Sequence, residues 1–194
     1  MPFPEILLAF AAYVAGSANM AIVLLKMVGK PDPRLFSSKN PGVVNVYRQE
    51  GPVWAGIVLV LEIGRAVAVA LAARYLLDGR FVAWIGLFLV VGNRYPVFHR
   101  FRGGKGVAAY LGFTLALVPI WAIVSMPAWL ITHRLTRTPF IGSFVMIGLL
   151  ATGMLVQSGG SMLEALGTFA TIALIVHGHG SNMRQWRSGL RSSV

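Results

Sequence analysis

One segment of the sequence places a lysine among glycines in an arrangement suited to binding phosphate. Residues 92–107 read GNRYPVFHRFRGGKGV, in which Gly103, Gly104 and Gly106 surround Lys105. A glycine-rich turn that leads into a helix exposes backbone N–H groups at the positive end of the helix dipole and can hold an anion. Lys105 would add a flexible point charge for phosphate. We interpret the segment as a phosphate-binding loop; the alternative is a set of helix-capping glycines beside ordinary loop charges.

A second basic segment, SSKNPGVVNVYRQEG, interleaves small polar side chains with one arginine. Ser38, Asn40 and Asn45 offer hydrogen-bonding groups, and the Arg48 guanidinium is able to clamp two phosphate oxygens at once. We therefore expect this segment to bind phosphate together with the glycine loop.

Arg65 lies within an apolar stretch, VLVLEIGRAVAV, where an unpaired charge is costly. Glu62 stands three residues earlier, on the same face of a helix, so the two side chains can form an ion pair. Two interpretations stay open: Arg65 and Glu62 pair for structural reasons only, or both line the site and Arg65 binds phosphate.

The histidines, at positions 99, 133, 177 and 179, show no metal-binding or catalytic-dyad spacing. No carboxylate clusters with them and no aspartate follows at the fifth position, so we expect no metal site. His99 also stands where a nucleotide-binding P-loop needs glycine, which disfavours nucleotide hydrolysis. His177 and His179 are candidate proton carriers or hydrogen-bond donors to phosphate; alternatively they mark the interfacial end of a helix.

Carboxylates are scarce near these segments, since Glu164 is the only one after Asp78. A general base would have to be Glu62, a histidine or the phosphate of the substrate itself. We therefore expect chemistry that depends on positioning anions and stabilising charge more than on proton abstraction by the protein.

The elements that must position these groups are membrane helices. Of the 194 residues, 56% are hydrophobic and 12% are charged, whereas soluble domains carry about 25% charged residues. The absence of cysteine excludes disulfides and thiolate metal sites. The net charge of +11 would suggest nucleic acid in a soluble chain, but membrane proteins concentrate Lys and Arg in cytoplasmic loops.

Apolar stretches near the roughly 20 residues that a spanning helix needs recur along the chain. We expect helices at 4–26, 53–75, 80–97, 106–118, 119–133, 139–157 and 162–177. The fourth and fifth are short and meet at Pro119, so they are half-helices or one bent pair.

Placing the N-terminus outside gathers most basic residues on the inside. The residues on that side are Lys26, Lys30, Arg34, Lys39, Arg48, Arg94, Arg100, Arg102, Lys105, Arg134, Arg137, Arg184, Arg187 and Arg191. We predict an all-α integral membrane protein with about seven transmembrane helices, its N-terminus outside and its C-terminus cytoplasmic. Residues 1–194 would form a single polytopic domain with cytoplasmic loops near 34–51, 92–107 and 177–187.

Taken together, the loops resemble the bacterial acylphosphate-dependent glycerol-3-phosphate acyltransferases (PlsY) over nearly the whole chain. The resemblance starts with AYVAGSANMAIVLLK and continues with a serine, asparagine, glycine and arginine pattern carried by Ser38, Asn40, Gly42, Asn45 and Arg48. It includes Leu61, Glu62 and Arg65, which correspond to the family's Leu-Asp-x-x-Lys; Glu62 and Arg65 carry charges of the same sign as the aspartate and lysine of that pattern. The most specific matches are YPVF at 95–98 and GGKGVA at 103–108, followed by Arg137 and Ser143.

The resemblance implies transfer of a fatty acyl group from acyl phosphate to the 1-hydroxyl of glycerol-3-phosphate, giving lysophosphatidic acid and phosphate at the start of phospholipid synthesis. It implies catalytic roles for Arg48, Lys105, His179 and Asn182. It implies substrate binding by Ser38, Asn40, Asn45, Arg65, Gly103, Gly104, Arg137 and Ser143. No cofactor, metal or nucleic acid is implied, and a monomer in the bacterial inner membrane with a cytoplasmic active site is expected.

The chain departs from the family pattern at a few polar positions. Asn93 replaces a histidine, and Gly180 and Ser181 replace an arginine and a glutamate. These departures keep open an alternative function, a non-catalytic lipid- or phosphometabolite-binding protein or transporter on the same scaffold.

Overall fold

The computed structural model describes residues 3–189, which form ten α-helices and two short 3₁₀ turns with no strand among them. Arg191, assigned above to the inside tail, lies outside the described residues. The helices are α1 Phe3–Ser17, α2 Met20–Met27, α3 Val43–Glu50, α4 Pro52–Leu76, α5 Gly79–Arg94, α6 Val107–Leu117, α7 Pro119–Thr136, α8 Pro139–Gln157, α9 Met162–Gly178 and α10 Gly180–Arg187. The turns are η1 Pro33–Leu35 and η2 Val97–His99. The all-α prediction is confirmed for this part of the chain.

The helix boundaries follow local signals in the sequence. Pro52, Pro119 and Pro139 each begin a helix, a position where the missing N–H of proline costs nothing. Asp78 and Ser161 cap the first turns of α5 and α9 through their side chains. The expected boundary at Pro119 is therefore confirmed, with α6 ending two residues before it.

Within residues 3–189, three helical segments are long and apolar enough to cross a membrane, or up to five if each bent pair counts as one crossing. One pair, α1 and α2, is bent by 46°, so the continuous helix expected at 4–26 is wrong: the chain breaks between Ser17 and Met20. The other pair, α9 and α10, is bent by 49°. Helix α6 is only 11 residues long. The number of crossings and the orientation of the termini stay predictions.

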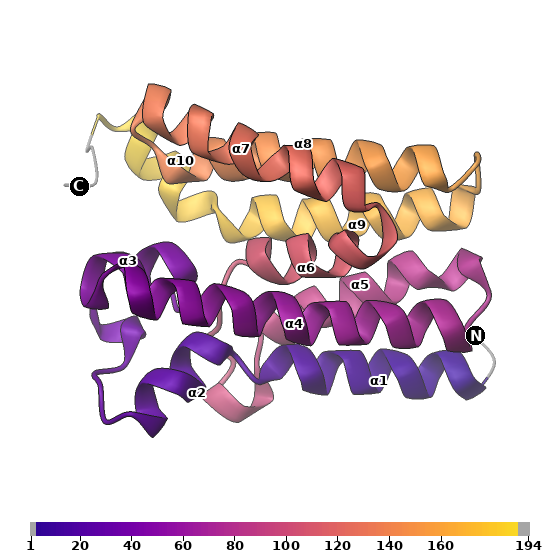
Figure 1. The fold of residues 1–194 in the computed structure, drawn as a ribbon, viewed down its shortest axis with the longest axis horizontal. Helices are drawn as coiled ribbons and strands as arrows, with labels where there is room; N and C mark the ends of the chain where they lie inside the picture. Colours follow the sequence, from indigo (N-terminus) through magenta and orange to yellow (C-terminus); the bar gives the residue numbers. More distant parts are fainter. Residues whose placement is uncertain (1–2, 190–194) are drawn as a thin grey trace.

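The helices pack in two groups, α1–α5 and α7–α10, which are joined by α6 and by the packing of α5 on α9 (Figure 1). Helix α1 packs on α5, α4 on α6, α5 on α9, and α7 on α8. Close approach is made possible by glycine: a Cβ on Gly16 would lie 2.1 Å from the Leu89 carbonyl oxygen, and one on Gly92 would lie 2.1 Å from that of Tyr13. Membrane helices often associate through small residues at their crossings. Since lipid is as apolar as the helix surfaces, close packing has to replace the hydrophobic effect as the force that holds the helices together.

The basic segments of the chain meet at one end of the bundle. Figure 1 shows α2, α3 and α10 at this end, opposite the N-terminus. Arg34 ties two of the segments together by donating hydrogen bonds to the carbonyl oxygens of His99 (2.9 Å) and Arg102 (3.4 Å). Its own orientation is fixed by Asp32, at 2.6 Å. The fold thus brings the loops that precede α3 and α6 next to each other. Short helices α3 and α10 occupy stretches that the sequence pattern predicts as loops.

Candidate active site

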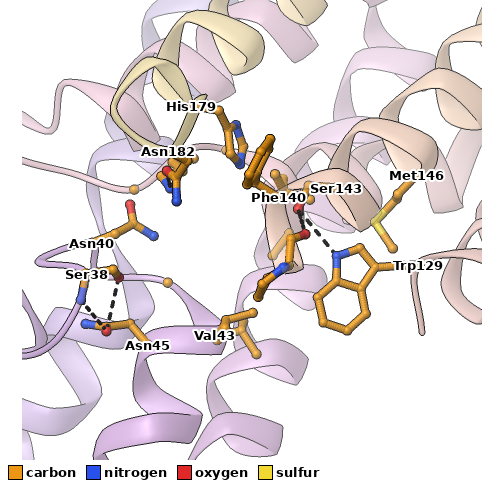
Figure 2. A pocket seen from close by; sticks show the side chains of 18 of the residues that line it. Ser38, Asn40, Val43, Asn45, Trp129, Phe140, Ser143, Met146, His179 and Asn182 are labelled. Carbon is orange, nitrogen blue, oxygen red and sulfur yellow. Dashed lines mark hydrogen bonds between the residues drawn. The ribbon is translucent and has the colours of Figure 1, made fainter. Parts of the chain in front are cut away.

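A cavity of about 1080 Å³ opens between the basic segments and the helices behind them. Figure 2 shows its polar side chains approaching from three directions: Ser38, Asn40 and Asn45 from the chain before and within α3, His179 and Asn182 from the α9–α10 region, and Ser143 from α8. The predicted site residues that line it are Ser38, Asn40, Asn45, Arg48, Gly104, Lys105, Arg137, Ser143, His179 and Asn182. Arg65 and Gly103 do not line it.

The glycine loop has the geometry of a turn that leads into a helix. Gly106 adopts a left-handed conformation with φ +85°, and α6 begins at the next residue. The Gly104 N–H donates a hydrogen bond of 2.9 Å to the Asn93 carbonyl oxygen. A Cβ on Gly103 would lie 2.0 Å from that same oxygen, so this glycine is needed for packing, beneath the cavity wall. The loop is therefore held against the end of α5 with Lys105 at the cavity.

Lys105 is a largely buried cation with one fixed partner. Its ammonium group donates a hydrogen bond to the side-chain oxygen of Asn182. Burial, followed by repulsion from Arg94 and Arg48, lowers the pKa of Lys105 to about 8. No carboxylate of residues 3–189 forms an ion pair with it. An anion that enters the cavity would find this charge uncompensated.

The segment before α3 is shaped by Asn45, which is only 1% exposed. The side chain of Asn45 accepts hydrogen bonds from the backbone and hydroxyl of Ser38 (3.2 and 3.1 Å) and donates to the carbonyls of Pro33 and Phe36 (2.7 and 3.1 Å). Asn45 therefore fixes the loop that presents Ser38 and Asn40, and its polar atoms are already engaged in that work.

Two further arginines stand at the cavity without a carboxylate partner among the described residues: Arg48, in the last turn of α3, and Arg137, between α7 and α8. Arg137 adopts a left-handed backbone with φ +54°. Ser143 lies near the start of α8, where its hydroxyl donates to the Pro139 carbonyl at 3.2 Å and accepts from Trp129 at 3.4 Å. The cavity mouth is thus positive on more than one side.

His179 is 3% exposed and held in one orientation. Its Nδ1 lies 2.9 Å from the Ile175 carbonyl oxygen, which can only accept, so Nδ1 carries the proton in the neutral ring. The edge of the ring packs against Phe144 with centroids 5.3 Å apart. This assignment leaves Nε2 as a hydrogen-bond acceptor. His177, the other histidine considered, is exposed and lies outside the cavity lining.

Arg65 lies behind the cavity wall, where it is paired with Glu62. Its Nη1 atom also donates to backbone carbonyls at the break between α1 and α2. Glu62 itself lines the cavity, with its carboxylate engaged by Arg65 and the Met20 N–H. This geometry favours the structural interpretation of the pair and gives no support to Arg65 as a phosphate ligand.

Residues that sequence reasoning did not single out complete the walls. Asn19, at the break between α1 and α2, lines the cavity beside Asn93. Behind the polar mouth is an apolar wall, to which Val58, Leu59, Leu111, Met126, Trp129 and Met146 contribute. Asn19 follows the Gly-Ser pair of the first apolar stretch, and asparagine before a helix is a capping signal that could have revealed the break. Among residues 3–189 no cluster of side chains could hold a metal ion.

Comparison with known proteins gives consistent similarities. Residues 6–189 match the protein-family profile described as glycerol-3-phosphate acyltransferase. Relatives of that name from Pseudomonas paraeruginosa and Pseudomonas fluorescens are 38% and 36% identical over 184 and 185 residues, which is 94% of this chain and 96% of each relative.

Two solved structures have the same fold. One is PlsY, described as an integral membrane glycerol 3-phosphate acyltransferase in its glycerol 3-phosphate form, with a TM-score of 0.86 at 30% identity, covering 96% of this chain and 93% of that one. The other, the lysophosphatidic acid form of PlsY, has a TM-score of 0.85 at 29% identity, with the same coverage. Every residue that lines the cavity falls inside the matched range.

Proposed function

The chain belongs to the glycerol-3-phosphate acyltransferase family, and we propose that it takes its acyl group from acyl phosphate and carries out the transfer in the cavity described above. It is an integral membrane acyltransferase that esterifies glycerol-3-phosphate in phospholipid synthesis.

The observation that supports this site most strongly is the pairing of unneutralised cations with an apolar wall. Lys105, Arg48 and Arg137 line the polar mouth without carboxylate partners among residues 3–189. Leu59, Met126 and other apolar side chains line the remainder. An acyl phosphate and a lysophosphatidic acid each join a phosphate to a long hydrocarbon chain. In both molecules the phosphate fits the basic mouth of the cavity and the hydrocarbon chain fits its apolar wall. The similar PlsY structures are described with glycerol 3-phosphate and with lysophosphatidic acid.

The reaction forms one ester bond and breaks one anhydride bond. The 1-hydroxyl oxygen of glycerol-3-phosphate attacks the acyl carbonyl carbon, the carbonyl oxygen gains negative charge, and the bond from carbon to the phosphate oxygen then breaks. The hydroxyl proton ends on the departing phosphate. Lys105, Arg48 and Arg137 would hold the two phosphates so that hydroxyl and carbonyl meet. Fixed donors, among them glycine-loop N–H groups other than that of Gly104, would stabilise the developing charge.

His179 and Asn182 are assigned to orienting the acceptor. The unprotonated Nε2 of His179 would accept a hydrogen bond from the attacking hydroxyl, because Nδ1 is engaged by Ile175. Asn182 would hold Lys105 in place for the phosphate. Ser38, Asn40 and Ser143 would add hydrogen bonds to phosphate or glycerol oxygens at the edges of the cavity.

The cavity lies at the end of the bundle where the basic segments meet, so we infer that it faces the cytoplasm from the bacterial inner membrane. We further propose that the protein works as a monomer.

The experiment that tests the donor compares palmitoyl phosphate with palmitoyl-coenzyme A as acyl source for the purified protein. Acyl phosphate should support formation of lysophosphatidic acid with kcat/KM on the order of 100-fold higher, because only its leaving group places a phosphate at the reacting carbon. Equal use of the thioester would overturn the proposed donor, while leaving the acyltransferase assignment intact.

A further inference from the structure

Arg65 closes one side of the break between α1 and α2. Its Nη1 atom donates hydrogen bonds to the carbonyl oxygens of Ala15, Gly16 and Ala18, at 2.8, 3.0 and 2.5 Å. These carbonyls have lost the partners that a continuous helix would supply, and inside a membrane protein water does not replace them. The negative end of the α1 dipole also favours a cation at this point.

Glu62 closes the other side of the same break. Its Oε1 atom accepts a hydrogen bond of 2.8 Å from the Met20 N–H, at the start of α2, while Oε2 pairs with Arg65. The negative charge of the Glu62 carboxylate is favourable at the positive N-terminal end of the α2 dipole, and the positive charge of the Arg65 guanidinium is favourable at the negative C-terminal end of the α1 dipole. Both side chains are nearly inaccessible, at 6% exposed for Glu62 and 9% for Arg65. The pair thus fixes both helix ends through one turn of α4.

Asn19, the residue held in this break, is hydrogen-bonded to the segment before α3 and lies next to the glycine loop. Its Oδ1 caps α2 by accepting from the Ile22 N–H at 3.1 Å, and its Nδ2 donates to the Pro41 carbonyl at 3.1 Å. The position of a Cβ on Gly104 would be 3.4 Å from that Nδ2 and 3.5 Å from the Pro41 oxygen. Asn19 therefore lies where the segment before α3 touches the glycine loop.

We propose that Arg65 is a positioning residue for glycerol-3-phosphate, acting through Asn19 to hold the two phosphate-binding segments in register. The proposal rests on the function proposed above, since it assumes that these segments bind the phosphate. Arg65 itself touches no substrate: it fixes the break, the break fixes Asn19, and Asn19 fixes the spacing between Pro41 and Gly104.

Beside Glu62, arginine reaches more partners than lysine, the residue of the family's Leu-Asp-x-x-Lys pattern, would reach at this position. The two N–H groups of Nη1 lie within hydrogen-bond distance of three carbonyls, so one N–H is shared, while Nη2 serves Glu62 on the same rigid plane. A lysine ammonium has three N–H groups on one atom, so it cannot serve all three carbonyls and Glu62 together. Arg65→Lys should therefore preserve the charge and the fold while loosening the break.

The experiment is a double-mutant cycle on the purified, full-length protein, with the glycerol-3-phosphate concentration varied at saturating palmitoyl phosphate. Arg65→Lys and Asn19→Ala should each raise KM for glycerol-3-phosphate about tenfold and leave kcat within about threefold. The double variant should have a KM for glycerol-3-phosphate no higher than that of the single variant with the higher KM, because both substitutions disturb the same chain of contacts. Arg74→Lys, in the last turn of the same helix at an exposed position, is the matched control and should match wild type.

Two results would overturn the proposal. If Arg65→Lys lowers only the yield of folded protein, and the folded fraction keeps the wild-type KM, then Arg65 serves folding alone. If the effects of the two substitutions on KM multiply, then Arg65 acts independently of Asn19, as a direct phosphate ligand would. The rise in thermal unfolding midpoint that glycerol-3-phosphate causes in each variant measures its affinity for this ligand without turnover, so the single and double variants can be compared by binding as well as by KM. If the wild-type protein binds glycerol-3-phosphate but shows no turnover, the proposed reaction is wrong. The binding data of the variants then still show whether Arg65 positions the phosphate-binding segments.

Discussion

The Lys105 ammonium donates a hydrogen bond to the side-chain oxygen of Asn182, joining the glycine loop to α10 across 77 positions of sequence. Both residues line the cavity, and the bond uses one of the three N–H groups of the lysine. The remaining N–H groups are free to face a phosphate. This single contact therefore couples the C-terminal helix to the principal anion-binding group.

Neutral and charged replacements of Asn182 should have clearly different effects. Asn182→Ala removes the hydrogen bond and should lower kcat/KM for glycerol-3-phosphate about tenfold. Asn182→Asp keeps an acceptor but adds a carboxylate that neutralises Lys105 and repels phosphate, so the loss should be on the order of 100-fold. Steady-state kinetics measure both, with Ser188→Asp on the exposed end of α10 as the charge-matched control. Equal activity of the Asn182→Asp and Asn182→Ala variants would contradict a phosphate at Lys105.

The pH dependence of activity should report the ionisation of Lys105. Its pKa is lowered to about 8, so the ammonium is charged below that pH and neutral above it. The phosphate of the acceptor is a dianion above about pH 6. We expect kcat/KM for glycerol-3-phosphate to be level between about pH 6.5 and 7.5 and to fall about tenfold per pH unit above 8. Lys105→Arg stays charged throughout and should remove the fall above pH 8, whatever its absolute activity. A wild-type profile that stays flat to about pH 10 would argue against a charged Lys105 as the binding group.

Two glycine-to-alanine substitutions should have opposite outcomes. A Cβ on Gly103 would lie 2.0 Å from the Asn93 carbonyl oxygen, so Gly103→Ala must displace the glycine loop. We expect kcat/KM to fall on the order of 100-fold, with a lower thermal unfolding midpoint. Gly64→Ala, within α4, meets nothing within 4 Å and should stabilise the helix by up to about 1 kcal/mol with activity unchanged. Wild-type kinetics in the Gly103→Ala variant would show that the loop is not rigidly placed.

Narrowing the apolar wall should change the preference for the donor chain. Leu59 lines the cavity on α4, whereas Leu61 on the same helix is 40% exposed and does not. Leu59→Trp should lower kcat/KM for palmitoyl phosphate at least about tenfold while affecting octanoyl phosphate about threefold or less, because added bulk excludes the longer chain first. Leu61→Trp is the control and should leave the ratio between the two donors unchanged. Equal losses for both donors would place the acyl chain elsewhere.

Much of the architecture follows from short-range signals in the sequence. Pro119 and Pro139 begin helices where proline predicts them, and the glycine loop leads into α6 at Val107 as its spacing predicts. Lys105 and Arg48 could be identified as cavity residues because a lysine among glycines and an arginine among small polar residues carry a local chemical meaning.

The sequence could not locate features that depend on contacts between distant segments. Asn19 gives a local capping signal at the break between α1 and α2, but the side chains that satisfy its other exposed backbone groups, Glu62 and Arg65, lie 42 to 50 positions away in the sequence. For the same reason the sequence pattern leaves open whether Arg65 binds phosphate, whereas the structure gives it Glu62 and backbone carbonyls as partners. Asn45 matches a binding motif, yet its side chain shapes the loop that presents Ser38.

The central claim is tested most directly by phosphate release from purified protein in lipid, given palmitoyl phosphate and glycerol-3-phosphate, with Lys105→Ala measured in parallel. Lys26→Ala, at an exposed position outside the cavity, controls for the lost positive charge. We predict release that depends on the acceptor, equal in wild type and the Lys26→Ala variant, and at least about 100-fold lower in the Lys105→Ala variant. Acceptor-dependent release that is the same with and without Lys105 would contradict the phosphate site on which the proposed function depends.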